Sequence, residues 1–205
     1  MSTFNIHAGH NYHVPGASGI LSETNANRVI KNKLITILRD EGHTVYDCTD
    51  EDGKTSAQNL ANIVNKCNKH KVDLDISIHF NAFNGKVQGT EVLQYSDKTK
   101  DVATRICKNI SALGFTNRGV KDGSNLYVLK NTNSKAILIE CCFCDNTEDA
   151  KRYNPDKMAN AIASAILNKT ISSKNTKKVE LEDIYEAINN INDKVSTIMK
   201  IVKDI

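Results

Sequence analysis

The sequence predicts an α/β domain with a twisted, mostly parallel sheet flanked by helices on both faces, followed by a C-terminal heptad helix. Short apolar runs with a two-residue period alternate along the chain with longer runs whose apolar residues recur every three or four positions. Strands that alternate with helices favour a parallel sheet covered on both sides. The final stretch, residues 179–205, repeats its apolar positions in strict steps of three and four.

The individual elements are predicted in chain order from these periods. Residues 3–8 form a strand, and a loop rich in glycine and asparagine over 9–22 leads to a helix that Gly42 ends. That helix covers 23–41 and is followed by a strand over 43–49, a helix around 60–67, strands over 73–80 and 89–95, a helix over 97–113, strands over 126–130 and 136–143, and a helix from Pro155 to about Thr170.

The composition excludes several classes of protein. Of the 205 residues 40% are hydrophobic and 25% charged, which is typical of a globular domain. The net charge of +3 permits a polyanionic partner, but no basic stripe or aromatic platform indicates nucleic-acid binding. No apolar run is long enough for a transmembrane helix, and the start lacks the pattern of a signal peptide. We therefore expect synthesis in the cytoplasm without a signal peptide, and no membrane insertion.

The six cysteines are expected to be reduced and to pack as small hydrophobic residues. They stand at positions 48, 67, 107, 141, 142 and 144. Cys141 and Cys144 form a C-x-x-C pair in the cluster CCFC. A zinc-thiolate or redox site would need a second pair or a helix N-cap, and neither is visible.

The chain is predicted to divide into a domain over 1–171, a polar linker over 172–178 and a coiled-coil-like helix over 179–205. The apolar positions of that helix are Leu181, Ile184, Ile188, Ile191, Val195, Ile198, Val202 and Ile205. Isoleucine and valine at the d positions disfavour a parallel dimer. We expect the helix to mediate homo-oligomerisation or docking to a helical partner. Antiparallel pairing and packing on its own domain stay open.

Three predicted strand ends and one helix start carry side chains suited to a zinc site. His10 follows the first strand, His79 ends the strand over 73–80, Glu140 lies in the strand over 136–143, and Glu23 begins the first helix. In open α/β sheets, functional residues gather at the carboxyl ends of the strands. A catalytic zinc takes three N or O ligands, and a nearby carboxylate can act as general base. Each residue also has an ordinary interpretation: His79 as a core histidine, and Glu140 as a helix cap or the partner of a lysine.

Four sequence marks occur in order over about residues 3–170. They are a Gly-His pair near the start, a Glu about a dozen residues later, the strand end SIHFNA, and the segment LIECCFCDN. They belong to the blocks HAGHNYHVPGASGILSETNANRV, ISIHFNAFNGKVQGTEVLQY and RGVKDGSNLYVLKNTNSKAILIECCFCDNTEDAKRY. In these blocks the chain resembles the zinc-dependent N-acetylmuramoyl-L-alanine amidases of the Amidase_3 type, which include phage endolysins and bacterial autolysins.

The resemblance implies a function and a set of site residues. It implies that His10, Glu23 and His79 bind one Zn²⁺ per chain, and that Glu140 is the general base and acid for a zinc-activated water. The bond cleaved would be the amide between N-acetylmuramic acid and the L-alanine of the stem peptide in bacterial peptidoglycan. A phage or phage-like endolysin would reach the wall after holin-type or lysis-dependent release. Glu91, in GTEV, is assigned no role.

The remaining histidines and the competing functions stay open at this stage. His7 either supports the site or lies at the surface, and His13 is expected to face solvent. A zinc peptidase that cuts within the stem peptide would use similar ligands. A non-catalytic wall-binding or structural subunit would make the heptad helix the main feature. Mass spectrometry of digested wall separates the two enzymes, and turnover on purified wall excludes the third interpretation.

Overall fold

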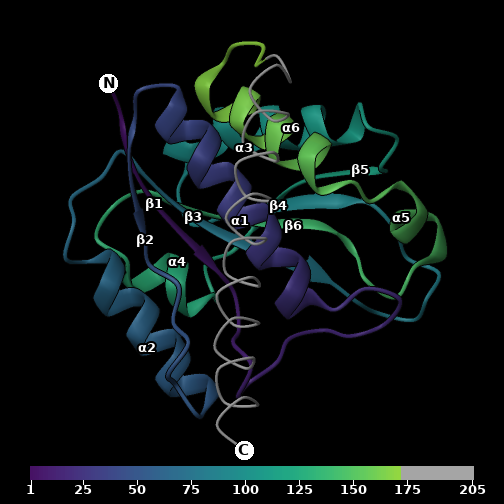
Figure 1. Cartoon of the computed structure of the whole chain (residues 1–205), viewed down its shortest axis with the longest axis horizontal. Helices are drawn as coiled ribbons and strands as arrows, with labels where there is room; N and C mark the ends of the chain where they lie inside the picture. Colours follow the sequence, from purple (N-terminus) through teal and green to yellow (C-terminus); the bar gives the residue numbers. More distant parts are fainter. Residues whose placement is uncertain (172–205) are drawn as a thin grey trace, which may run out of the picture. The chain divides into compact units, whose positions relative to one another are not determined.

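A six-stranded sheet positions the functional residues, with the strand order β2-β1-β3-β6-β4-β5 (Figure 1). The computed structural model describes residues 1–171. The strands are β1 (Thr3–Ala8), β2 (Thr44–Asp47), β3 (Leu74–Asn81), β4 (Thr90–Gln94), β5 (Asn117–Asp122) and β6 (Ala136–Phe143). Strands β2, β1, β3 and β6 are parallel, whereas β4 runs antiparallel to β6 and parallel to β5. The mostly parallel sheet is therefore confirmed, and β1, β3 and β6 end at one edge.

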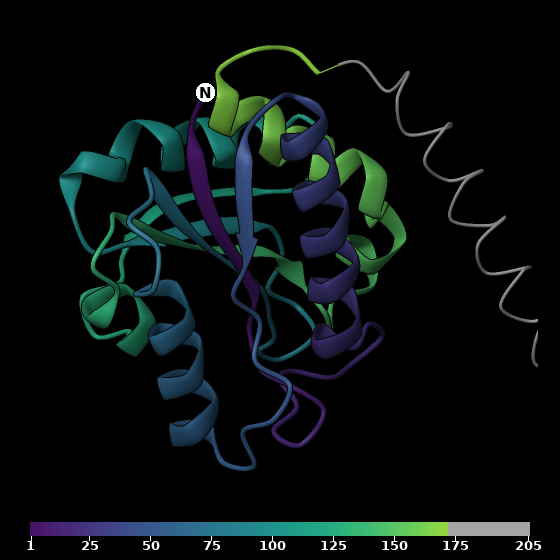
Figure 2. The same cartoon turned by 60° about the vertical axis from the view of Figure 1, so that its left-hand side comes forward.

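Helices cover both faces of this sheet, as predicted. They are α1 (Glu23–Asp40), α2 (Ser56–Cys67), α3 (Lys100–Ser111), which follows a 3₁₀ turn over Asp97–Thr99, α4 (Tyr127–Asn131), α5 (Thr147–Arg152) and α6 (Pro155–Leu167). On one face, α6 packs against both α1 and α3 (Figure 1). Helices α2 and α4 contact each other on the opposite face, where α2 is blue and α4 green in Figure 2.

Helix α1 has the apolar stripe that its sequence period predicts. Ile30, Leu34 and Leu38 are fully buried and face the sheet and α6. The helix ends at Asp40, and Gly42 follows two residues later with a left-handed φ of 82° and an N–H that donates to the carbonyl of Arg39. Because α1 is fixed along its length by this stripe, its first residue has a defined place beside the carboxyl ends of the strands.

The strand predicted for residues 126–130 is wrong, because this segment forms α4 (Tyr127–Asn131). A short apolar run has no period long enough to separate a strand from a buried helical turn. In a strand, the consecutive residues Val128 and Leu129 would face opposite sides. The helix lets both enter one buried cluster with residues of α2 and β6.

Two elements were not predicted from the sequence. Strand β5 (Asn117–Asp122) reads NRGVKD, in which Val120 is the one aliphatic side chain, and it lies at the edge of the sheet. Helix α5 (Thr147–Arg152) is short, and Asn146 caps it by accepting hydrogen bonds from the N–H groups of Glu148 and Asp149. Neither segment has an apolar period that would predict it, so each owes its conformation to contacts with the rest of the domain.

Residues 1–171 contain all six cysteines and every helix that the structure describes. All six cysteines are buried, and none forms a disulfide, so their packing role is confirmed. No helix within residues 1–171 is long and apolar enough to cross a membrane. The linker over 172–178 and the heptad helix over 179–205 lie outside the described residues, and the predicted domain division stays a prediction.

A buried carboxyl group in β3 makes the stability of the domain depend on pH. Asp75 is 2% exposed, and its Oδ1 accepts a hydrogen bond from Nδ2 of Asn5 at 2.6 Å. Its Oδ2 and the Oδ1 of Asn5 are buried without hydrogen-bond partners. Burial raises the pKa of Asp75 to about 6, although Asn5 and Cys67 favour the charged form. The charged form of Asp75 is therefore destabilising in the folded protein.

We expect Asp75→Asn to stabilise the protein above pH 6 and to have little effect near pH 4. Between these values the folded state holds the Asp75 proton while the unfolded state has released it, so the free energy of unfolding falls as pH rises. The gain should approach about 3 kcal/mol, and denaturant unfolding at several pH values measures it. Asp101→Asn, at an exposed position of α3, is the control for the change in charge. A gain that is equal at all pH values would contradict the assignment.

Candidate metal and catalytic site

His10 follows β1 in a turn that two side chains of α1 hold in place. The Gly9 N–H donates to the carbonyl of Ile78, and the Gly9 carbonyl accepts from Nδ2 of Asn27 at 2.7 Å. The His10 carbonyl accepts from Nη2 of Arg28 at 3.1 Å. His10 itself has a φ of 58°, which is uncommon for a residue other than glycine. Strained backbone of this kind persists where surrounding contacts fix it, and it often marks a functional position.

Glu23 is the first residue of α1, and its carboxylate is buried. The N–H of Ala17 donates to Oε2 at 2.7 Å, so the loop between β1 and α1 folds back onto this side chain. The N–H of Phe80 donates to Oε1 at 3.1 Å, which connects the same carboxylate to β3. Glu23 is 2% exposed and receives hydrogen bonds from both directions.

His79 completes a group of three side chains with metal-ligand chemistry. Its Nδ1 lies 3.0 Å from Oε1 of Glu23, and Nε2 of His10 lies 3.7 Å from Oε2 of Glu23. One ligand atom from each of the three residues lies within 4.8 Å of the others. Two imidazoles and one carboxylate are the N and O donors that a catalytic Zn²⁺ takes in proteins, so the residues present fit this ion.

Two glycines make this close approach possible. A Cβ added at Gly9 would lie 2.0 Å from Cε1 of His79, and one added at Gly16 would lie 2.2 Å from Oε2 of Glu23. Real Cβ contacts are not this short. The loop HAGHNYHVPGASGILSE therefore needs glycine at both positions for the imidazole and the carboxylate to meet.

The ionisation of the three residues reflects their burial and their mutual contacts. Burial would raise the pKa of Glu23, but the hydrogen bond with His79 and the nearby imidazoles hold it below its usual value. Burial lowers the pKa of His10, against the opposing effect of Glu23. For His79, burial favours the neutral ring, but Glu23 and Glu140 raise its pKa overall. A cation among the three would interact favourably with the same carboxylates that favour the proton on His79.

Glu140 lies beside this group on the neighbouring strand. Its Cα is the register partner of His79 in the parallel pair of β3 and β6. Its Oε2 is buried and has no hydrogen-bond partner among the described residues. Burial, against the opposing effect of His79 and with the support of the Glu23 and Glu91 carboxylates, raises the pKa of Glu140 to about 7. A carboxyl group in this state can both accept and donate a proton near neutral pH.

The structure also places the histidines whose roles the sequence left open. His7 is 2% exposed, and its Nδ1 lies 3.4 Å from Oγ of Ser77, so the surface interpretation of His7 is wrong. Burial, together with the nearby His79, lowers the pKa of His7 to about 3. His13 is exposed, as predicted.

One part of the site was not found from the sequence. Glu91, which was given no role, is the register partner of Glu140 in the antiparallel pair of β4 and β6. Its carboxylate contacts Nε of Arg118 at 2.9 Å and Nδ2 of Asn81 at 3.2 Å. The signal that could have indicated it is a lone acidic residue between Thr90 and Val92 in an otherwise uncharged strand.

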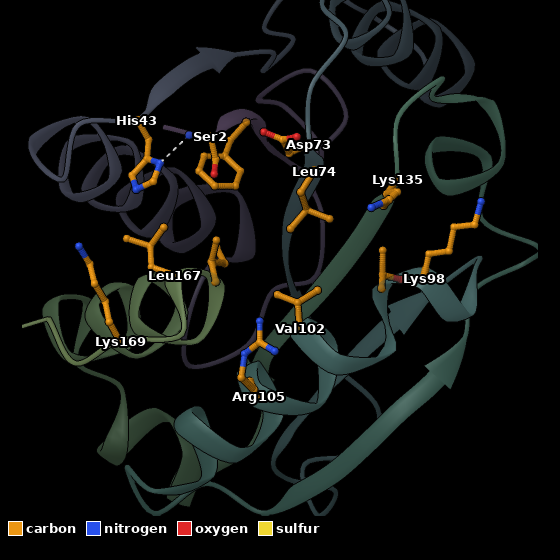
Figure 3. Close-up of a pocket in the computed structure, with 13 residues that line it drawn as sticks. Ser2, His43, Asp73, Leu74, Lys98, Val102, Arg105, Lys135, Leu167 and Lys169 are labelled. Atoms are coloured by element: carbon orange, nitrogen blue, oxygen red, sulfur yellow. Dashed lines mark hydrogen bonds between the residues drawn. The ribbon is translucent and has the colours of Figure 1, made fainter.

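A small cavity lies next to His10 and His79. A cavity of about 80 Å³ is lined by His7, His10 and His79 together with residues of α2. A larger hollow of about 410 Å³ is lined by Leu74, Val102 and Leu167, with Arg105 and Lys135 beside them (Figure 3). Leu74 begins β3 and Lys135 precedes β6, so the larger hollow lies at the opposite edge of the sheet.

The sequence matches the family described as N-acetylmuramoyl-L-alanine amidase, Amidase_3, over residues 5–190. The chain belongs to this family. It is 35% identical over 131 residues to an uncharacterized cell wall amidase of Bacillus anthracis, which covers 58% of this chain and 24% of that protein. It is 30% identical to the N-acetylmuramoyl-L-alanine amidase LytC of Bacillus subtilis, over 83% of this chain and 35% of that protein.

Other curated relatives are longer than this chain or have no described activity. Two uncharacterized proteins of Clostridium perfringens are 37% and 33% identical to it. The matches span 52% and 61% of the length of those two proteins.

Solved structures of amidases share the fold. The catalytic domain of the CD27L endolysin, which targets Clostridia difficile, superposes with a TM-score of 0.79 at 34% identity, over 84% of this chain and all of that domain. The catalytic domain of CwlV, an N-acetylmuramoyl-L-alanine amidase from Bacillus (Paenibacillus) polymyxa, superposes with a TM-score of 0.72 at 26% identity, over 82% of this chain and 97% of that domain. The Amidase_3 domain and its α/β fold are thus shown for this chain.

We expect Gly9→Ala to weaken binding of Zn²⁺ by about 10- to 100-fold, the range typical of changes that misorient a metal ligand. The new methyl group would overlap the ring of His79 and force it to move. Competition with a chromophoric chelator measures the affinity.

Gly42→Ala is the control, because Gly42 also has a positive φ but lies far along the chain from the site, at the end of α1. It should reduce the free energy of unfolding by about 1 kcal/mol and leave the affinity for zinc unchanged. Wild-type affinity in Gly9→Ala would show that His79 is not a ligand.

Proposed function

We propose that this protein is a zinc-dependent N-acetylmuramoyl-L-alanine amidase of bacterial peptidoglycan. It would cleave the amide bond between N-acetylmuramic acid and the L-alanine of the stem peptide. One observation carries the proposal: His10, Glu23 and His79 bring their ligand atoms within 4.8 Å of one another, next to the partnerless buried carboxyl oxygen of Glu140. Membership of the Amidase_3 family supports the choice of reaction.

The four residues divide into three proposed ligands and one proton carrier. His10, Glu23 and His79 would hold one Zn²⁺, which when bound supplies Lewis-acid polarisation of a water molecule and of the scissile carbonyl. The oxygen of the water attacks the carbonyl carbon while Glu140 takes a proton from that water. As the C–N bond breaks, Glu140 donates that proton to the departing nitrogen of L-alanine, and its carboxylate is restored. The raised pKa of Glu140 suits both transfers.

The surroundings of the site suit a polymeric substrate better than a small enclosed one. The nearby cavity of about 80 Å³ is far below the volume of a pocket that encloses a small-molecule ligand. Loops after β1 and β3 expose Tyr12 and Phe83, which are 65% and 75% accessible. An open edge with exposed aromatic rings leaves room for a glycan strand and its peptide.

The relatives support an endolysin or autolysin role, and we propose a phage or phage-like endolysin. The Endolysin of Bacillus phage SPP1 is 34% identical over 107 residues, which cover 48% of this chain and 39% of that protein. The protein would be made in the cytoplasm and would reach the wall after holin-type or lysis-dependent release. Its partner would then be the peptidoglycan itself.

We expect a chelator to abolish digestion of purified cell wall and added Zn²⁺ to restore it. The products should contain new N-terminal alanine, because the bond to the lactyl group of N-acetylmuramic acid is broken. Mass spectrometry and dinitrophenyl labelling of the released ends measure this. New N-termini at other stem residues would indicate a peptidase, and new reducing sugar ends alone would rule out both enzymes.

We expect Glu140→Gln to fold and to bind zinc within about twofold of the wild-type affinity, but to lose at least about 100-fold in kcat. The amide keeps the shape of the side chain and removes its ability to carry the proton. Glu148→Gln, at an exposed position of α5, is the matched control and should retain full activity. Substantial turnover by Glu140→Gln would refute its assignment as the base.

We also propose, from the heptad spacing alone, that residues 179–205 mediate homo-oligomerisation or docking to a helical partner. Light scattering of the full chain should give a mass above that of the 22.7 kDa monomer. A chain that ends near Lys174 should be monomeric. A monodisperse full-length monomer would exclude self-association and leave a foreign partner as the alternative.

A further inference from the structure

A row of functional side chains crosses four neighbouring strands of the sheet. Glu140 on β6 is the register partner of His79 on β3 and of Glu91 on β4. Directly paired residues present their side chains on the same face of a sheet. Arg118 on β5 extends the row, because its Nε lies 2.9 Å from Oε2 of Glu91. The order is therefore imidazole, carboxyl, carboxylate and guanidinium.

The guanidinium of Arg118 is held in a fixed orientation. Glu91 is 9% exposed, and its other oxygen accepts a hydrogen bond from Asn81. The carbon at the centre of the Arg118 guanidinium lies 5.1 Å from the centre of the Phe143 ring, a cation–π contact. The register of β4 and β5 shifts between Thr90 and Val92, opposite Arg118. Arg118 lies at this irregularity, and its side chain reaches Glu91 on β4.

Two nitrogen atoms of Arg118 remain available to a ligand. Its Nε is engaged with Glu91, but within the described residues no hydrogen bond joins Nη1 or Nη2 to the protein. The side chain is 34% exposed, so these atoms can be reached from solvent. A planar guanidinium with two free amino groups matches the two oxygens of a carboxylate.

We propose that Arg118 binds a carboxylate of the stem peptide and makes the enzyme selective for it, an inference that rests on the proposed amidase function. In peptidoglycan the second stem residue is a D-glutamate linked through its γ-carboxyl, so its α-carboxyl is either free or amidated. Arg118 would bind the free form.

The spacing of the row agrees with this assignment. The Arg118 guanidinium contacts Glu91. Glu91 and Glu140 are register partners on adjacent strands, and adjacent strands lie about 5 Å apart. A group on the second residue beyond the cleaved bond lies within about 7 Å of that bond along an extended chain. A peptide that leaves the scissile carbonyl near Glu140 and runs toward β5 therefore brings its second residue to Arg118.

The charges of the row explain why a cation is needed at this point. Glu23, Glu140 and Glu91 are three neighbouring carboxyl groups. Arg118 is a cation that pairs with Glu91, the member of this group on β4. A substrate carboxylate that approached these groups without a cation would be repelled. The amidated form lacks this charge and gains less from the guanidinium.

The test compares two N-acetylmuramoyl tripeptides that differ only in the α-carboxylate or α-carboxamide of the second residue. For the zinc-loaded full chain we expect kcat/KM to be about 10- to 100-fold higher for the carboxylate, as for hydrogen bonds between charged groups. Arg118→Met should lose this preference, because kcat/KM should fall much more for the carboxylate form than for the carboxamide form. Arg118→Lys keeps the charge without the fork and should retain part of the preference.

Lys121→Met is the matched control, since it removes a positive charge from the same strand at an exposed position. It should keep the wild-type preference. Inhibition by the dipeptides L-alanyl-D-glutamate and L-alanyl-D-isoglutamine gives a second readout, and only inhibition by the former should weaken in Arg118→Met. Zinc content and thermal unfolding verify that each variant is folded.

Two results would overturn the inference while leaving the proposed function intact. One is a wild-type enzyme that cleaves both substrates equally well. The other is an Arg118→Met variant that loses the same factor on both, which would reduce Arg118 to a structural partner of Glu91. Failure of the zinc-loaded wild type to cleave either substrate would instead count against the amidase function itself, and the inference would fall with it.

Discussion

The carboxylate of Glu23 is the contact on which the geometry of the site depends. It accepts hydrogen bonds from the loop at Ala17 and from β3 at Phe80, and it contacts both His10 and His79. A buried carboxylate is costly unless its oxygens are satisfied. Because these partners come from separate parts of the chain, the cost is offset only when the loop, α1 and β3 are assembled together. The same contact that completes the fold locally therefore brings the three candidate ligands together.

In the sheet, strand direction reverses between β6 and its neighbour β4, and this reversal brings Glu91 and Arg118 to the site. A purely parallel sheet would place only the carboxyl ends of strands at the edge that holds the candidate site, as happens for β1, β3 and β6. Because β4 is antiparallel to β6, the start of β4 lies at that edge, and Glu91 comes to stand opposite Glu140. Strand β5 runs parallel to β4 and adds Arg118 by the same geometry. The parallel strands thus supply the imidazoles and Glu140, the proposed proton carrier, and the reversed pair supplies the side chains beside them.

The parts of the site that the sequence predicts are those with local signals. His79 ends a strand with a clear two-residue period, and Glu23 begins a strongly amphipathic helix, so the edge on which each would lie could be inferred. The arrangement of Glu91 and Arg118 could not, because it depends on a register shift between two strands, one of which has almost no apolar residues. The segment over 126–130 was misassigned for a related reason: only its packing against α2 decides between strand and helix.

Features that lower stability are concentrated where the chemistry is proposed. His10 has a left-handed backbone, Gly9 and Gly16 give up side-chain packing for close approach, and Glu140 leaves a buried oxygen without a partner. These features are not expected where folding is the only requirement. A backbone with an ordinary φ, or an apolar side chain in place of the buried carboxyl group, would give a more stable protein. The buried β strands and the α1–α6 layer supply the stability that allows them. Asp75 also has an unpartnered oxygen, but it lies in the amino-terminal part of β3, away from the candidate ligands.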